Sequence, residues 1–219
     1  MSWEKLLKEN KPLVITGTIN AYSALLAERA GIKAIYLSGG GVANASYGLP
    51  DLAMTSREDV LEDVRRIRSA TELPLLVDID TGWGSALSIS RTIKEMISAG
   101  ASGVHIEDQV SEKRCGHRPN KEIVSSAEMV DRIKAAKDAQ TDDNFLLMAR
   151  TDAFAKGGLQ EVIDRSNAFI EAGAEAIFPE AISTLKDYKE ISNNVSMPIL
   201  ANITEFGMTP LFSHNELAD

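Results

Sequence analysis

The sequence predicts an α/β barrel built on a parallel sheet, and three observations lead to that fold class. Short apolar runs alternate with longer amphipathic stretches along most of the chain. The phrase Ala-Gly-Ala recurs at 99–101 and 172–174, each time between an amphipathic stretch and an apolar run, as in repeated βα units. Nearly every apolar run also ends in polar or ionisable residues. Barrel enzymes build their sites from many strand ends, whereas an open sheet uses one switch point, so a barrel is favoured.

Each expected strand is short, nearly continuously apolar and rich in Ile, Leu and Val, as in a sheet buried on both faces. The expected strands are residues 13–17, 34–38, 75–80, 103–107, 145–150, 176–180 and 198–202. Helical spacing of apolar residues, with capping residues such as Ser85 before and Gly100 after, predicts the helices between them. The expected helices are residues 1–8, 57–70, 85–99, 126–140 and 158–172.

Only seven strands can be found in this way, and an eight-stranded barrel cannot close on seven without exposed edges. The residues from 213 to 219 read as the start of the helix that follows the seventh strand. We therefore expect residues 1–219 to form a single (β/α) barrel domain that stops after its seventh strand. The chain is then expected to be a fragment of a longer protein.

Composition narrows the class of protein. The 219 residues are 44% hydrophobic and 25% charged, which is ordinary for one globular core. A net charge of -9 argues against a nucleic-acid or anionic-membrane partner, and no apolar run is long enough to span a bilayer. One cysteine excludes an intrachain disulfide, and the N-terminus lacks the pattern of a signal peptide. A cytoplasmic enzyme is expected.

Carboxylates at the ends of two neighbouring strands predict a metal site. Asp78 and Asp80 are two residues apart, so in a strand both side chains point to one face. Glu107 ends the next strand, and three such carboxylates suit a hard cation such as Mg²⁺. Asp51 could orient metal-bound water from a second layer. The alternative is that these aspartates only cap the loops that follow.

The loop 113–119 is basic in an otherwise acidic chain, with four of its seven residues Lys, Arg or His. Such surroundings favour the thiolate form of Cys115 or let its thiol exchange protons near neutral pH. The loop lies in a long polar connection, where an active-site lid could sit. The alternative is a solvated basic loop that contains a cysteine by chance.

Other strand ends offer further candidates, each with a structural alternative. The loop Ser38-Gly39-Gly40-Gly41 could hold an anion on its backbone N–H groups, or could be a plain flexible turn. Arg150 could clamp a carboxylate and Glu180 could accept from a substrate hydroxyl, or the two could form a buried structural ion pair. His105 lies mid-strand and is expected to be a core histidine rather than a ligand.

Taken together, these segments resemble the isocitrate lyase and phosphoenolpyruvate mutase superfamily, and within it the members that cleave methylisocitrate. The resemblance extends over essentially the whole chain, and the Lys-Arg-Cys-Gly-His loop is its most specific part. The segments that carry it are 38–41, 78–84, 105–109, 113–121, 148–152 and 202–207.

The resemblance implies a TIM-type (β/α)8 barrel with a helix exchanged between subunits of a homotetramer. It implies Mg²⁺-dependent cleavage of a tricarboxylate, 2-methylisocitrate, to pyruvate and succinate in the methylcitrate cycle of propionate catabolism. Asp78 and Asp80 would bind the metal, supported by Glu107 and Asp51, with Cys115 on the catalytic loop. The substrate-binding positions that it implies are Ser38, Gly39, Gly40, Cys115, Gly116, His117, Arg150, Glu180, Asn202 and Thr204.

Splitting a β-hydroxy acid also needs a base for the hydroxyl group, and Tyr36 is the candidate, on the strand that leads to Ser38. Cys115 is placed to protonate the succinate fragment. Two other readings stay open. One is isocitrate cleavage to glyoxylate and succinate, since one methyl group is worth only about 1–3 kcal/mol of discrimination. The other is a barrel fragment without catalytic activity.

Overall fold

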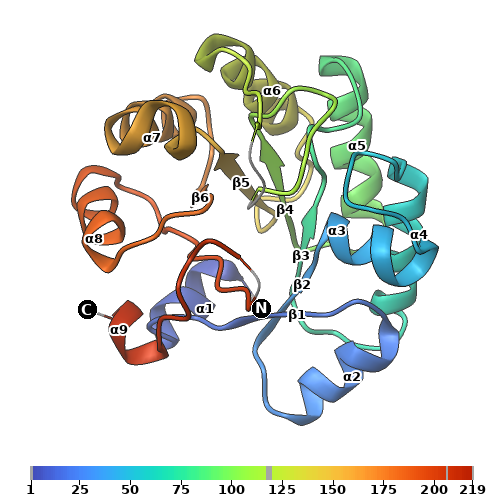
Figure 1. Ribbon diagram of the computed structural model, residues 1–219. Helices are drawn as coiled ribbons and strands as arrows, with labels where there is room; N and C mark the ends of the chain where they lie inside the picture. Colours follow the sequence, from blue (N-terminus) through green and yellow to red (C-terminus); the bar gives the residue numbers. More distant parts are fainter. Residues whose placement is uncertain (1, 117–119, 206, 219) are drawn as a thin grey trace.

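The computed structural model describes residues 2–116, 120–205 and 207–218, and its centre is a six-stranded parallel sheet in the order β1-β2-β3-β4-β5-β6. The sheet curves into a half-barrel with helices around its outer side (Figure 1). The strands are β1 (Ile15–Gly17), β2 (Ala34–Leu37), β3 (Leu75–Asp78), β4 (Gly103–Glu107), β5 (Leu146–Thr151) and β6 (Ala176–Pro179). The helices are α1 (Trp3–Glu9), α2 (Ala21–Arg29), α3 (Gly39–Gly41), the π-helix η1 (Val42–Ser46), α4 (Arg57–Arg68), α5 (Ala86–Ser98), α6 (Ser126–Asp138), α7 (Phe154–Glu171), α8 (Leu185–Asn194) and α9 (His214–Ala218).

The prediction of a parallel α/β sheet with strands in chain order is confirmed, but the seventh strand is wrong as a regular element. Residues 198–202 follow β6 in the expected place and form a single parallel bridge, between Ile177 and Ile199. Ile177 N donates to Pro198 O at 2.9 Å, and Leu200 N donates to Ile177 O at 2.8 Å. Pro198 has no N–H group, and no further strand pairs with this segment among the described residues, so the ladder stops there.

The helices agree with the prediction to within a few residues at most ends. The main difference is α7, which begins four residues early because two helical pieces join across Gly158, whose φ is 68°. Helices α2 and α8 were missed. Both carry side-chain caps at their first turn, a reciprocal one between Asn20 and Ser23 in α2 and one from Thr184 in α8.

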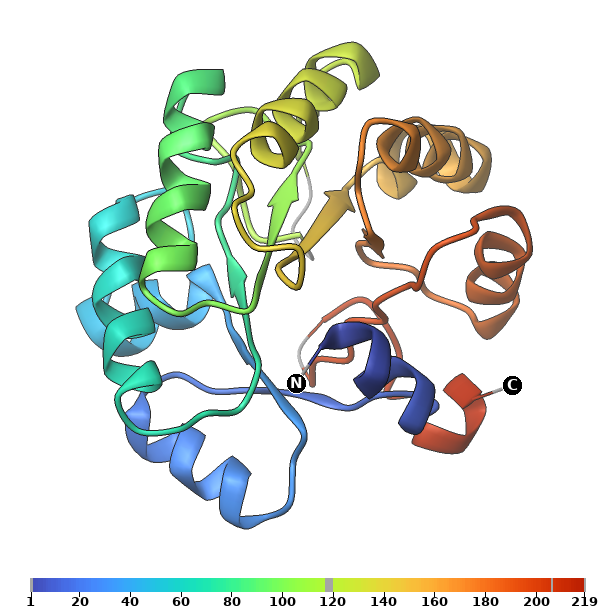
Figure 2. The same cartoon turned by 180° about the vertical axis from the view of Figure 1, so that it is seen from behind.

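Alternation along the strands separates two layers of side chains. Residues such as Ile35, Leu75 and Val77 point outward and pack under the helices. The inward residues form a second cluster at the amino ends of the strands, where α1 adds Trp3 and Leu6. Figure 2 shows α1 lying across this end of the sheet. The amino end of the half-barrel is therefore filled with apolar side chains.

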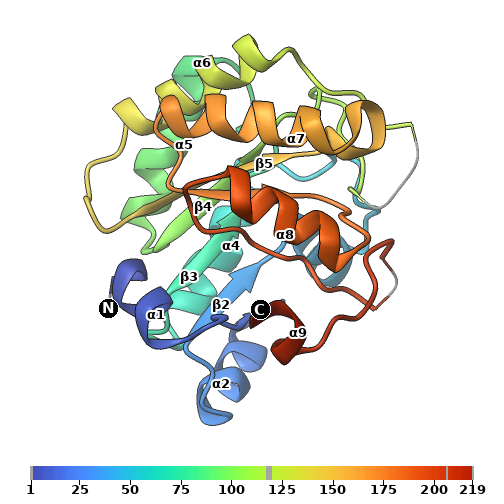
Figure 3. The same cartoon turned by 90° about the vertical axis from the view of Figure 1, so that its left-hand side faces the viewer.

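At the carboxyl ends of the strands the inward positions become polar. The register pairs Asp78 on β3 with His105 on β4, and Glu107 on β4 with Arg150 on β5. In Figure 3 the long connection after β4 lies at the end of the sheet opposite α1. The fold thus gathers the charged residues of the strands at one end of the sheet.

Among the described residues no helix is both long and apolar enough to cross a membrane.

Candidate active site

A cavity of about 1180 Å³ opens at the carboxyl ends of the strands and continues along the gap between β1 and residues 198–204. It brings together most of the side chains that the sequence singled out, from the ends of four strands, from the segment 198–204 and from the cysteine loop. Gly39, Asp80 and Glu107 do not line it, and His117 lies outside the described residues. The predicted residues that line it are Tyr36, Ser38, Gly40, Asp51, Asp78, Cys115, Gly116, Arg150, Glu180, Asn202 and Thr204.

The glycine loop after β2 is the start of a short helix and not a flexible turn. Ser38 is the N-cap of α3, and its side chain accepts from Gly41 N at 3.3 Å. Gly39 N donates to Asp78 Oδ2 at 3.0 Å, so a protein carboxylate already occupies this backbone donor. A Cβ on Gly39 would lie 3.1 Å from Asp80 Oδ1, and one on Gly40 would lie 3.2 Å from Asp51 Oδ2. Glycine lets the loop approach these carboxylates closely.

Asp78 and Asp80 are close together for a different reason from the one expected. The strand ends at Asp78, and Asp80 lies in a turn with a positive φ of 47°, so strand alternation does not place it. Asp80 N donates to Asp78 Oδ1 at 3.0 Å and holds that turn. Both side chains are buried and approach the same point, next to Gly39.

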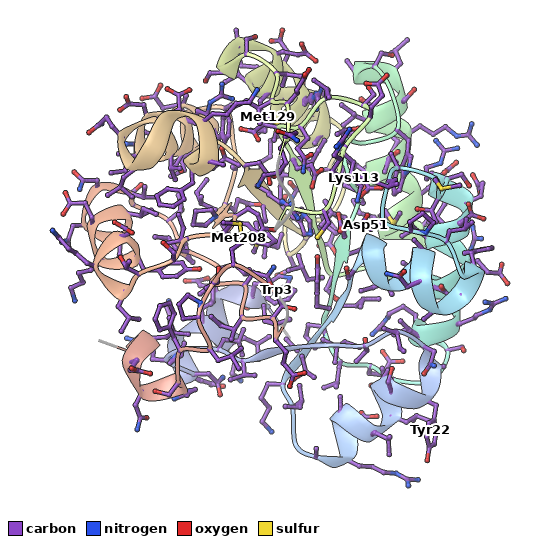
Figure 4. All side chains as sticks on the ribbon, in the orientation of Figure 1. Trp3, Tyr22, Asp51, Lys113, Met129 and Met208 are labelled. Carbon is purple, nitrogen blue, oxygen red and sulfur yellow. The ribbon has the colours of Figure 1, made fainter. Side chains whose placement is uncertain are left out.

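A lysine stands among these carboxylates, which the sequence did not reveal. Lys113 Nζ lies 2.5 Å from Asp51 Oδ1 and 2.7 Å from Asp80 Oδ1, and its side chain is buried (Figure 4). Within the described part of the chain, no three Asp, Glu, His or Cys side chains converge closely enough to hold a metal ion as they stand. The Lys113 ammonium group partly neutralises the negative charge of Asp51 and Asp80.

Burial and mutual repulsion split the pKa values of the cluster. Burial raises the pKa of Asp78, but His105, Lys113 and Arg150 together outweigh it and bring that pKa to about 2. Burial, and then the charge of Asp78, raise the pKa of Asp80 to about 7. Burial also raises the pKa of Glu107 well above its ordinary value, although Arg150 opposes this. Near neutral pH the cluster therefore shares protons.

The composition of the site fits a divalent cation. Glu107 Oε1 is buried and has no hydrogen-bond partner among the described residues. Carboxylate oxygens are the ligands that Mg²⁺ prefers. Six carboxylates surround the site against three cationic side chains, so negative charge is in excess. The carboxylates are Asp51, Asp78, Asp80, Glu107, Asp152 and Glu180, and the cations are Lys113, Lys121 and Arg150.

Arg150 links the carboxylates at the ends of β4 and β5 to Glu180, which follows β6. Its Nε lies 3.3 Å from Glu107 Oε2 and 3.0 Å from Asp152 Oδ2, and its Nη2 lies 3.1 Å from Glu180 Oε2. The guanidinium group also stands 5.1 Å above the centre of the Phe178 ring. The buried ion pair considered for Arg150 and Glu180 therefore exists, in a cavity wall where both side chains remain accessible to a ligand.

The cysteine loop lies directly on this network. A Cβ on Gly116 would overlap Arg150 Nη2 and the Glu180 side chain, so only glycine allows the approach. Lys121 Nζ donates to Gly116 O at 2.5 Å and to Asp152 Oδ1 at 2.6 Å. Lys113 and Lys121 thus bind carboxylates, whereas the basic composition of the loop 113–119 had suggested that Lys113 acts on the Cys115 thiol. Cys115 is half-buried and faces the cavity.

Tyr36 and His105 form a pair on the inner face of the sheet. Tyr36 Oη lies 2.8 Å from His105 Nε2, and that nitrogen lies 3.5 Å from Asp78 Oδ1. Burial lowers the pKa of His105 to about 4, so the ring is neutral at physiological pH. Burial, and then Asp78, raise the pKa of Tyr36 well above its ordinary value. His105 is buried as expected, but it contacts the site and does not merely fill the core.

A parallel α/β half-barrel with an acidic cluster at its strand ends and a cysteine loop beside the cavity is typical of α/β enzymes. The chain belongs to the phosphoenolpyruvate phosphomutase family, whose model matches residues 4–219. Among solved structures it resembles an oxaloacetate acetylhydrolase in complex with 3,3-difluorooxalacetate, with a TM-score of 0.93, 32% identity, and 99% of this chain and 75% of that chain covered. A 2,3-dimethylmalate lyase follows at a TM-score of 0.91 and 31% identity, with 98% and 73% covered.

Relatives of higher identity carry one name. The chain is 62% identical to the 2-methylisocitrate lyase of Shewanella oneidensis over 218 residues, which cover 100% of this chain and 75% of that protein. It is 63% identical to the 2-methylisocitrate lyase of Escherichia coli over 213 residues, which cover 97% of this chain and 72% of that protein. The 2-methylisocitrate lyase of Bacillus subtilis is 44% identical over 217 residues, with 99% and 71% covered.

Proposed function

We propose that this chain is a carbon–carbon lyase that cleaves 2-methylisocitrate to pyruvate and succinate. The observation that carries the proposal is the identity of more than 60% with two 2-methylisocitrate lyases across nearly the whole chain. The cavity supports it, since cationic and acidic side chains surround a space large enough for a tricarboxylate. The pathway would be the methylcitrate cycle of propionate catabolism, in the cytoplasm.

Asp78 and Asp80 would hold Mg²⁺, with Glu107 and Asp51 supporting it. When bound, the cation supplies Lewis-acid stabilisation of the oxygens of the oxo-acid fragment. The excess of carboxylates and the unpartnered Glu107 Oε1 support this assignment. The Lys113 ammonium contacts Asp51 and Asp80, so we expect it to compete with the cation for these oxygens.

The chain's own residues then divide the proton transfers. Tyr36, as the phenolate, would take the proton of the substrate hydroxyl group. The carbon–carbon bond would then break, and its electron pair would pass to the carbon of the succinate fragment. The Cys115 thiol would give its proton to that carbon. Burial, and then the charge of Asp78, raise the pKa of Tyr36, so a cation that offsets the Asp78 charge would favour the phenolate form.

The remaining residues would bind and orient the substrate. Arg150 offers a planar pair of donors to a carboxylate, and Glu180 holds it in place. Gly116 brings the cysteine loop onto this pair, which would exclude water from the reacting groups. The other proposed contacts are Ser38, Gly39, Gly40, His117, Asn202 and Thr204.

Replacing the thiol tests the assignment. We expect Cys115→Ala to lower kcat by roughly 100-fold or more, the range for loss of a general acid, while Mg²⁺ affinity stays the same. The rate of pyruvate release from 2-methylisocitrate measures kcat, and titration calorimetry measures the Mg²⁺ affinity. Turnover equal to that of the unaltered chain would exclude Cys115 as the proton donor. The ratio of kcat/KM for 2-methylisocitrate and isocitrate then decides between the two substrates.

We also propose that the half-barrel is part of a complete (β/α)8 barrel domain that assembles as a homotetramer with exchanged helices. The relatives are longer than this chain, which spans 75% and 72% of the first two. The gap between β1 and residues 198–204 is lined by apolar side chains such as Leu13, Ile15 and Leu200, as an unfinished barrel would be. The intact mass of the purified protein, followed by light scattering, would test both points.

A further inference from the structure

His105 is a buried polar group to which the proposed mechanism gives no task. It is 0% exposed on the inner face of β4, with the Tyr36 ring 5.7 Å and the Phe178 ring 5.2 Å from its own. Its Nε2 is 2.8 Å from Tyr36 Oη, but its Nδ1 has no hydrogen-bond partner among the described residues. A buried ring nitrogen left without a partner costs free energy, so the site must gain something from this arrangement.

A neutral imidazole can meet Tyr36 in two ways. If Nδ1 carries the hydrogen, Nε2 accepts from the Tyr36 hydroxyl, and that hydroxyl proton is bound to the ring. If Nε2 carries the hydrogen, it donates to Tyr36 Oη, and the hydroxyl keeps its own proton free. Only the second arrangement leaves Tyr36 able to exchange a proton with a molecule in the cavity, which Tyr36 lines.

The position of Asp78 decides between the two. Its Oδ1 lies 3.5 Å from the same Nε2 that contacts Tyr36. An N–H group there faces the carboxylate with its positive end, whereas a lone pair there faces negative charge at close range. In the second arrangement the unpaired group at Nδ1 is a lone pair, whereas in the first it would be an N–H donor. A buried N–H donor without an acceptor is rarer and costs more free energy than a buried lone pair without a donor.

We propose that His105 is held as the Nε2–H tautomer and is a positioning residue for Tyr36. Its N–H donates to Tyr36 Oη, leaves the hydroxyl proton free to pass to solvent water in the cavity, and stabilises the phenolate that remains. The phenolate then takes the proton of the substrate hydroxyl group, and His105 neither gains nor loses one. The catalytic consequence rests on the proposed function, but the tautomer does not.

Nitrogen NMR of the ¹⁵N-histidine-labelled chain tests the tautomer without any substrate. The chain has three histidines, and the variants His105→Gln and His214→Gln assign the signals by loss of one each. We expect the protonated nitrogen of His105 to be Nε2 and the unprotonated one to be Nδ1. Protonation at Nδ1 would overturn the proposal, whether or not the chain cleaves 2-methylisocitrate.

A double-mutant cycle tests the coupling. We expect His105→Leu to lower kcat by roughly tenfold to a hundredfold, the range for losing a hydrogen bond to a charged group, with KM little changed. In a Tyr36→Phe background the same change should have no further effect, because its partner atom is gone. His105→Gln, whose amide N–H can reach toward Tyr36 Oη, should restore most of the rate. Losses that multiply, or no restoration by glutamine, would show that His105 supports only the fold. If His105→Leu fails to fold, the tautomer measurement still decides.

Discussion

Replacing Lys113 with methionine removes an ammonium group that contacts both Asp51 and Asp80. Methionine keeps most of the length and apolar body of the side chain, so the change is mainly one of charge. Lys113 is buried, and its two ion pairs are 2.5 Å and 2.7 Å long. Leaving one partner of a buried ion pair uncompensated typically costs about 3–5 kcal/mol. The substituted chain should therefore be less stable by an amount that depends on pH.

The pH dependence follows from Asp80, whose pKa is about 7 in the folded chain. In the unfolded chain its pKa is close to 3.9, so between these values the folded state holds the extra proton, and stability falls by about 1.4 kcal/mol per pH unit. In the unaltered chain this decline ends near pH 7. Without Lys113 the pKa of Asp80 rises further, and the decline continues. Between pH 7 and 8 the variant should therefore lose about 1 kcal/mol more than the unaltered chain does.

Urea unfolding at pH 6, 7 and 8, with and without Mg²⁺, measures these differences. The matched control is Lys8→Met, which removes a fully surface-exposed pair with Glu4 and should leave stability unchanged. Added Mg²⁺ should stabilise the Lys113 variant more than the unaltered chain, because the ammonium no longer competes. A variant that loses less than about 1 kcal/mol at every pH, well below the loss for a broken buried pair, would refute the reasoning.

Asp80 must also lose its proton before it can bind a cation, so Mg²⁺ affinity should rise about fivefold from pH 6 to 7 and only about twofold more above pH 7. Calorimetry in two buffers of different ionisation enthalpy would detect the released proton, and an affinity independent of pH would contradict the assignment. Gly116→Ala should lower kcat by about 100-fold, because displacement of the loop by about 1 Å misplaces Cys115, while stability changes little. Gly17→Ala, where a Cβ would meet nothing within 4 Å, is the control, and equal activity of the two variants would be the opposing result.

Much of the fold was predictable because apolar periodicity reports burial directly. Runs such as 75–80 and 103–107 are apolar because helices cover one side of the sheet and the barrel interior the other. The sequence alone could not show that residues 198–202 do not form a regular strand, since this segment has the same apolar pattern as β6. What it lacks is a pairing partner on its outer side, and a sequence pattern does not contain that information.

The sequence predicted most of the residues that make up the site, but not which cationic side chain contacts which carboxylate. Strand ends converge in any parallel barrel, so Asp78 and Arg150 could be placed at one mouth from the sequence alone. Which cation meets which carboxylate depends on the path of the connection after β4, and that path put Lys113 between Asp51 and Asp80. Lys121 was the available signal, as a further basic residue two positions beyond the cysteine loop, but nothing in its spacing indicated Asp152 as its partner.

The indole of Trp3 donates to Ser102 O at 2.7 Å, across 99 positions of the chain, and packs in the same cluster as Phe178. Helix α1 is synthesised before Ser102 and Phe178, so its partners leave the ribosome exit tunnel long after the helix itself. Contacts so distant along the chain make folding slow, because a large loop must close before they form. Helix α1 thus docks late although it is made before the strands that it packs on, and until then the amino end of the half-barrel stays open to water and to other apolar chains.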